Sequence, residues 1–153
     1  MVDPVEELAY AQSISVPYRY TAGAAQRAFL RGLEEGRIVG ARHGGRVLVP
    51  ARPFAPDGTR TGEFVDVAEE GTLVNFTTVP GEDGTRTFGM VQLDGADDAM
   101  LHLLDVPEGQ LVPGLRVRAR WARPRTAEIT AIEAFIPASD VWTSGLEDSR
   151  FGR

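Results

Sequence analysis

Three arginines and a phenylalanine lie close together between residues 41 and 58. Arg42, Arg46 and Arg52 precede Phe54. Guanidinium groups pair bidentately with phosphate, and an aromatic ring can stack on adenine. This is the composition that the nucleotide end of coenzyme A requires, so we predict contacts from Arg46, Arg52 and Phe54. Salt bridges to a partner, or a merely solvated loop, are the alternative, because arginine is favoured in those settings too.

Other groups capable of chemistry are few. His43 and His102 are the only histidines, and they cannot form the three-ligand set of a catalytic zinc without carboxylates. We expect His43 in an exposed loop and His102 half-buried on a strand, with a free-standing enzyme using either one as a weaker alternative. The acidic residues Asp94, Asp97 and Asp98 do not have the ligand spacing of an EF-hand. We expect them in a solvated turn. No serine elbow, HExxH, phosphate loop or dinucleotide fingerprint occurs, so we predict no catalytic residue.

A second group of arginines alternates with apolar residues near the end of the chain. Arg116, Arg118 and Arg120 would lie on one face of a strand. A barrel with such a face can bind single-stranded nucleic acid, which is our alternative function. Residues 63–153 contain 16 acids against 8 arginines, however. We therefore expect a solvated strand face and no nucleic-acid partner.

The composition of the chain excludes further classes of protein. The chain has 153 residues, a net charge of −6 and no cysteine, which argues against coating nucleic acid or an anionic membrane and excludes disulfides and thiolate metal sites. Its acidic first residues lack the features of a signal peptide, and no apolar run approaches the roughly 20 residues of a membrane span. We expect a cytoplasmic protein without a membrane partner.

The elements that would position these residues are mainly strands. A short helix is expected over residues 4–11, then an extended segment over 13–20, then a helix capped by Thr21 and stopped by Gly36. That helix carries an apolar face at helical spacing. Five alternating runs follow and predict a small closed barrel of the OB type; they span residues 72–79, 85–94, 100–105, 115–122 and 127–135.

Between the helix and the barrel, the sequence has the layout of a zinc ribbon without its ligands. A ribbon of this kind carries two CxxC knuckles about ten residues apart. The four ligand positions would be Ala41, Gly44, Ala55 and Gly58. None of these residues can bind a metal, so we predict no zinc and no other cofactor of the protein's own.

These pieces resemble the DUF35 family over about residues 17–137. The matching segments are residues 17–20, the helix with its end at Glu35 and Gly36, Pro50 with Arg52, and residues 70–77, 91–95 and 113–117. The resemblance implies a rubredoxin-like ribbon followed by an OB-fold, and an accessory role beside thiolase-like or hydratase-type enzymes that act on acyl-CoA. The chain departs from the family at all four zinc ligands, which leaves the ribbon without the order of 10 kcal/mol that a structural zinc supplies.

We therefore predict a mainly β protein with N-terminal helices, a degenerate zinc-ribbon hairpin and a five-stranded OB-fold barrel. The expected divisions are a helical segment (1–36), a metal-free ribbon (37–62), the OB-fold (63–137) and a C-terminal tail (138–153). The expected function is that of a non-catalytic subunit, in a hetero-oligomer with a thiolase, aldolase or hydratase, that stabilises its partner or helps present an acyl-CoA thioester. Lipid or sterol side-chain metabolism is the expected setting.

Overall fold

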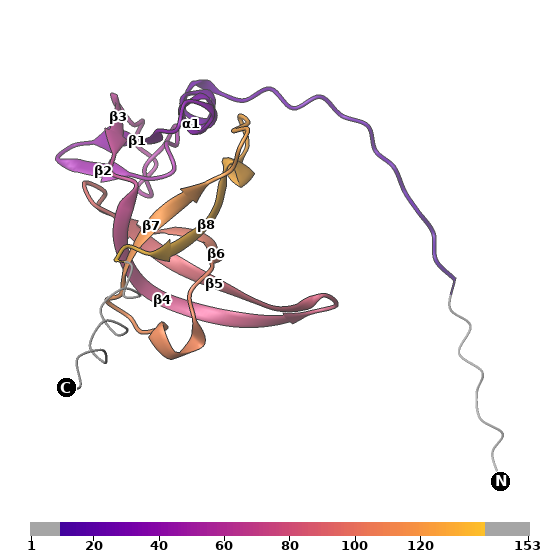
Figure 1. The fold of residues 1–153 in the computed structure, drawn as a ribbon. Coiled ribbons are helices and arrows are strands. Elements are labelled where there is room, and N and C mark those ends of the chain that lie inside the picture. The colour runs from indigo at the N-terminus through magenta and orange to yellow at the C-terminus, as the bar shows by residue number, and fades with distance from the viewer. Residues whose placement is uncertain (1–9, 140–153) are drawn as a thin grey trace, which may run out of the picture.

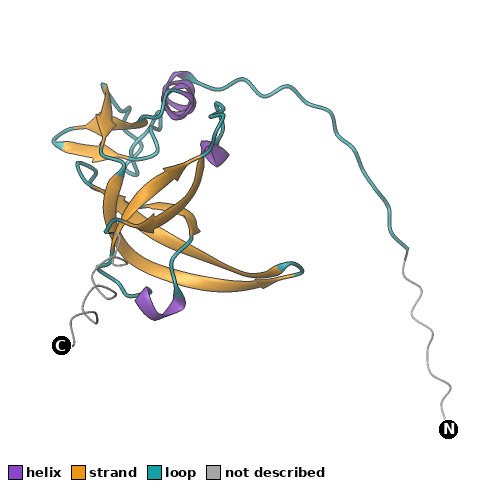
Figure 2. Cartoon of the chain, in the orientation of Figure 1, coloured by secondary structure: helices purple, strands orange, loops and turns teal. Residues whose placement is uncertain are grey.

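The computed structural model describes residues 10–139 as a barrel joined to a small sheet and one α-helix (Figure 1). Strands dominate the molecule, as predicted (Figure 2). In chain order the elements are α1 (Ala24–Glu34), β1 (Ile38–His43), β2 (Arg46–Leu48), β3 (Phe64–Val67), β4 (Glu70–Gly81), β5 (Gly84–Leu93), β6 (Met100–Leu104), the 3-10 turn η1 (Glu108–Gln110), β7 (Arg116–Trp121), the 3-10 turn η2 (Ile129–Ala131) and β8 (Ile132–Pro137). Among the described residues, no helix is both long and apolar enough to cross a membrane.

Five strands close into the predicted OB-like barrel, in the order β4-β5-β6-β8-β7. All neighbours pair antiparallel except β6 and β8, which pair in parallel at Leu104 and Phe135. Gly89 lines the interior, where an added Cβ would lie 2.5 Å from Leu73 Cδ1, so only glycine fits there. The last strand was predicted too early, because residues 129–131 form η2 and β8 begins at Ile132.

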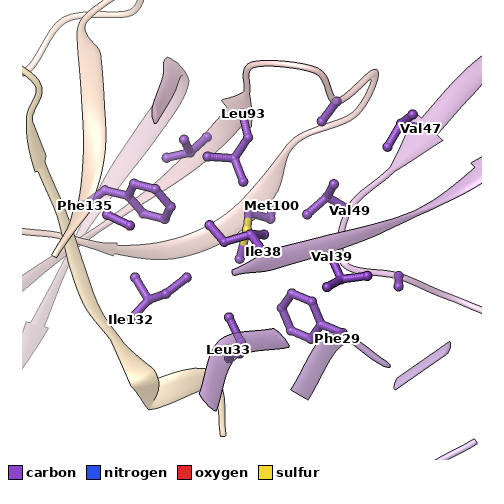
Figure 3. Close-up of a cluster of buried hydrophobic side chains, with 14 of the residues drawn as sticks. Phe29, Leu33, Ile38, Val39, Val47, Val49, Leu93, Met100, Ile132 and Phe135 are labelled. Atoms are coloured by element: carbon purple, nitrogen blue, oxygen red, sulfur yellow. The ribbon is translucent and has the colours of Figure 1, made fainter. Parts of the chain in front are cut away.

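The helix α1 has the predicted apolar face but not the predicted start. Phe29 and Leu33 are buried, and Figure 3 shows them facing Ile38 and Val39 of β1. The N-cap is Gly23, whose backbone is extended and offers no side-chain hydrogen bond, so Thr21 is not the cap. The helix expected over residues 4–11 lies almost wholly outside the described residues.

A three-stranded sheet in the order β2-β1-β3 connects α1 to the barrel. Its strand β3 pairs with β1 from Val67 opposite Ile38 to Phe64 opposite Ala41. Side chains from α1, this sheet and the barrel share one core, in which Phe135, Leu33 and Ile38 are fully buried (Figure 3). The ribbon-like sheet is therefore held by continuous apolar packing.

Residues 10–23 form an extended arm that precedes α1 and contains no helix or strand. In Figure 1 the arm runs away from the barrel and the small sheet. Two side-chain hydrogen bonds join the arm to α1: the Tyr20 hydroxyl donates to Gln26, and the Arg27 guanidinium donates to the Ala22 carbonyl at 3.4 Å. The extended conformation agrees with the expectation for residues 13–20.

Candidate functional site

The four predicted ligand positions of the ribbon do not fit a metal. Ala41 and Ala55 are buried methyl groups at 0% and 5% exposure. Gly44 and Gly58 have φ angles of 57° and 83°, in the left-handed region where a side chain is strained. These four residues offer no side-chain donor atom and do not fit a zinc ion.

A polar cluster joins the two turns of the ribbon instead. His43 precedes the first turn, and its Nε2 lies 3.3 Å from Asp57 Oδ2 in the second. Thr59 donates to Asp57 Oδ1 from its main-chain N–H at 2.9 Å and from its hydroxyl at 2.6 Å. The Thr59 hydroxyl also lies 3.2 Å from His43 Nε2. His43 was expected in an exposed loop, but it is half-buried and has these partners.

The Asp57 carboxylate is stabilised in its charged form by the same contacts. Hydrogen bonds from the side chain and main chain of Thr59 lower its pKa, and the nearby His43 adds a smaller lowering effect that burial partly opposes. An ionised carboxylate accepts hydrogen bonds more strongly than a neutral one. The cluster therefore holds the second turn closed and ties it to the first.

The barrel loop containing Asp97 and Asp98 binds the outer edge of β2. The main-chain N–H of Val47 donates to Asp97 Oδ2 at 2.7 Å, and the N–H of Val49 donates to Asp98 Oδ1 at 2.7 Å. The Asp97 N–H returns a bond to the Val47 carbonyl at 2.8 Å. The predicted turn is present and Asp97 is exposed, but the two carboxylates also satisfy main-chain donors of another sheet, which was not predicted.

The predicted coenzyme A contacts have different environments. Arg52 pairs with the Asp98 carboxylate and is part of the connection between ribbon and barrel. Phe54 is 50% exposed, and the Arg60 guanidinium lies 5.4 Å from its ring centre. Arg46 is exposed and has no ion-pair partner among residues 10–139. Their role as ligand contacts stays a prediction.

An open groove of about 660 Å³ lies beside this site. Phe29 and Leu30 of α1 form one wall, residues 50–53 form a second, and residues 127–130 form a third. The lining is mainly apolar, with Arg52 among the polar members. The groove can therefore accept a slender apolar group while its arginine stays paired with Asp98.

The arginine face of β7 is occupied by carboxylates. Arg116 donates to Asp94 at 2.8 and 2.5 Å, and these hydrogen bonds lower the pKa of that carboxyl. Arg120 donates to Asp105 at 2.6 Å and to Glu133 at 2.9 Å. Two of the three arginines are thus paired within the barrel, which removes the observation that motivated nucleic-acid binding.

His102 has the predicted structural role. It is 9% exposed, and its ring meets Phe135 edge-on at a centroid distance of 5.6 Å. Its two ring nitrogens lie 3.4 Å from the carbonyls of Leu103 and Ile129. The histidine is satisfied within the core and does not face the groove.

Sequence reasoning missed the residues that hold the site together. Thr59, Asp105 and Glu133 were not singled out, and the contacts of Asp97 and Asp98 with the ribbon were not predicted. A carboxylate that binds the main chain of a strand 50 residues earlier has no signature in the neighbouring sequence. A signal did exist in the ribbon itself, since a metal-free frame requires other contacts between its turns.

Comparison with known proteins agrees with this architecture. Residues 64–122 match the family model described as ChsH2, C-terminal OB-fold domain. A crystal structure of a DUF35-family protein of unknown function from Sulfolobus solfataricus aligns with a TM-score of 0.58 and 16% identity, covering 75% of this chain and 86% of that one. A chain of the Ltp2-ChsH2(DUF35) aldolase aligns with a TM-score of 0.58 and 17% identity, covering 79% of this chain and 100% of that one. No functionally curated protein matches.

The fold is that of an OB barrel preceded by a ribbon-like sheet that has no metal ligands. This fold is shared with the solved DUF35 structures, as the sequence resemblance predicted, and the barrel matches the ChsH2 OB-fold domain; the chain contains no cysteine.

Proposed function

We propose that this protein is a non-catalytic accessory subunit of an enzyme that acts on acyl-CoA. The partner would be a thiolase-like enzyme, such as a thiolase or an aldolase, or a hydratase. The observations that carry the proposal are the match of residues 64–122 to the ChsH2 OB-fold domain and the likeness of 79% of this chain to a chain of the Ltp2-ChsH2(DUF35) aldolase. The absence of any GxSxG, HExxH or nucleotide-loop motif from the sequence supports a role without bond-making of its own.

The ribbon face would lie at the mouth of the partner's active site. Arg46 is exposed and has no ion-pair partner within the described residues, so its side chain is free to meet a phosphate, whereas Arg60, which also has no carboxylate partner there, lies over the Phe54 ring. Phe54, further along the ribbon segment, is 50% exposed and can pack on adenine. Arg52 would contribute less than we first expected, because a phosphate would have to compete with Asp98.

In this role the subunit supplies binding and order, and the partner supplies the chemistry. Holding the nucleotide end of the thioester fixes the acyl group against the partner's catalytic residues, which raises the rate if the bound geometry resembles the transition state. We place the complex in the cytoplasm and in lipid or sterol side-chain metabolism, and its ligand is the shared acyl-CoA thioester.

Co-expression with a thiolase-like protein encoded beside this chain tests the proposal. We expect one complex by size-exclusion chromatography with light scattering, and acyl-CoA turnover that falls when this chain is left out. Separate elution, together with unchanged turnover, affinity and partner stability, would contradict the proposal.

A further inference from the structure

The arm formed by residues 10–23 has the sequence of a β-strand but no sheet to join. Four large apolar or aromatic side chains alternate with other residues, and all are strongly exposed: Ile14 (76%), Val16 (72%), Tyr18 (80%) and Tyr20 (67%). Alternation places these side chains on one face of a strand. Arg19 is the arm's single charged residue, in a chain that is 25% charged. Such a segment is suited to burial.

Pro17 determines which edge of the arm can pair. In a strand, the main-chain groups of successive residues point to opposite edges, and proline has no N–H to donate. The edge that contains Pro17 is therefore the poorer one. The other edge presents the N–H and C=O groups of residues 14, 16, 18 and 20, so the arm can join one sheet edge and stop there.

The barrel itself carries an open strand edge that could receive such a segment. β4 pairs with β7 only from Glu70 to Thr72, and Leu73 makes the last main-chain bonds on that side, with Leu115 and Gly114. Within residues 10–139, β4 then continues to Gly81 paired with β5 alone. Figure 1 shows the β4–β5 hairpin projecting beyond the barrel, so this edge is accessible.

The open edge has free groups in alternating positions. β4 and β5 are joined by a two-residue loop between Gly81 and Gly84, and the pair that closes such a loop exchanges hydrogen bonds across the hairpin. Counting back, Phe76, Thr78 and Pro80 direct their main-chain groups outward. Pro80 thus occupies the outer side, where its missing N–H costs no bond to β5.

The arm and this edge are alike in composition. β4 has no charged residue from Thr72 to Pro80, and Val74, Phe76 and Val79 are 45%, 38% and 45% exposed. Uncharged strands rich in β-branched and aromatic residues pair readily when an edge is free. The outer edge of β2 is different, because Asp97 and Asp98 already occupy it.

We propose that the arm of one copy adds to the open edge of β4 in a second copy, giving a dimer by reciprocal arm exchange. The hydrogen bond from Tyr20 to Gln26 fixes the root of the arm to α1, and the arm then leaves its own barrel (Figure 1). Two copies that each carry one arm and one edge form a closed, two-fold symmetric pair. This inference does not depend on the proposed enzyme partner.

Light scattering tests the dimer with two matched proline variants. The protein concentration is varied over roughly 1 to 100 µM, a range that brackets the micromolar dissociation constants of modest interfaces. Val16→Pro removes an N–H that faces the second copy, and Ser15→Pro removes one that faces solvent. We expect wild type and Ser15→Pro to dimerise, with Val16→Pro weakening the dimer by about tenfold or more. Both residues are exposed in the arm, so both variants should fold. Monomers at every concentration, or equal effects of the two prolines, would overturn the proposal.

Introduced cysteines locate the contact, because the natural chain has none. Val16→Cys protein is mixed in separate oxidation experiments with Thr78→Cys protein and with Ile129→Cys protein. Each partner carries one thiol, so a mixed disulfide reports contact between copies. Preferential bonding to residue 78 is the expected result. Preferential bonding to residue 129, which lines the groove beside α1, would place the arm elsewhere and overturn the proposal.

Discussion

Asp98 accepts a hydrogen bond at 2.7 Å from the main-chain N–H of Val49, a residue 49 positions earlier in the chain. The other oxygen of the same carboxylate pairs with Arg52. One acidic side chain of the barrel therefore satisfies both a strand edge and a guanidinium of the ribbon. A ribbon-like sheet whose turns carry no metal-binding side chains needs other contacts to order them, and this carboxylate supplies some of those contacts.

Replacing Asp98 with alanine should destabilise the protein. The change leaves the Val49 N–H and the Arg52 guanidinium without their acceptor in a half-buried setting, which costs about 1–3 kcal/mol. Urea unfolding of wild type and Asp98→Ala measures the difference. Asp83→Ala, in the exposed turn of the β4–β5 hairpin, is the control and should change stability by less than about 0.5 kcal/mol. Equal effects at the two positions would contradict the assigned role of Asp98.

Gly44 and Gly58 should resist substitution although there is space around them. Neither has a neighbouring atom within 4 Å of an added Cβ, but their φ angles are 57° and 83°. Alanine at either position should cost about 1–2 kcal/mol through backbone strain. Gly45→Ala is the matched control, because Gly45 has the same open surroundings without a positive φ. Thermal unfolding should show a higher melting temperature for Gly45→Ala than for the other two variants. Equal melting temperatures of all three variants would exclude backbone strain as the cause.

The contacts of Asp57 predict a stability that falls in acid. Its pKa is lowered in the folded protein, mainly by hydrogen bonds from Thr59. Such a group stabilises the fold above its unfolded pKa of about 3.9, and this contribution is lost as the pH falls through the lower folded value. Asp57→Asn should be less stable than wild type at pH 7 and should lose less on acidification. Urea midpoints measured from pH 7 down to pH 3 test this, with Asp83→Asn as the control; parallel curves for wild type and Asp57→Asn would count against it.

The paired arginines of β7 predict no affinity for nucleic acid. Arg116 and Arg120 are occupied by Asp94, Asp105 and Glu133, and a phosphate would have to displace these carboxylates in a chain of net charge −6. Fluorescence anisotropy with a labelled single strand at low salt should show no binding. Salt-sensitive binding that disappears in Arg116→Ala would restore the alternative function.

Local patterns were enough to predict the barrel and the main helix. The alternation around Val117 and Ala119, both buried, and the helical spacing of Phe29 and Leu33 reflect single elements that pack on one core. The helix start was misjudged because Thr21 has the right residue type, while the structure caps the helix with Gly23. The partners of Asp98 could not be predicted, since they depend on how a barrel loop meets another sheet. Pairing across such distances is a property of the fold and not of the local sequence.

Alanine substitutions of Arg46 and Arg52 should have different effects, although the two residues lie close together in the sequence. Arg52 holds Asp98, so Arg52→Ala should lower the free energy of unfolding by up to about 1 kcal/mol, a small value because the pair is partly exposed. Arg46 has no ion-pair partner among the described residues, so Arg46→Ala should leave stability unchanged.

In the reconstituted enzyme complex, Arg46→Ala should raise the KM for acyl-CoA by about tenfold, the value of one charged hydrogen bond to phosphate. Arg86→Ala, on the exposed part of β5, is the control for general charge effects. If Arg46→Ala leaves KM unchanged, or if Arg86→Ala raises it equally, the ribbon does not contact the phosphates of coenzyme A. The accessory role would then rest on stabilising the partner alone.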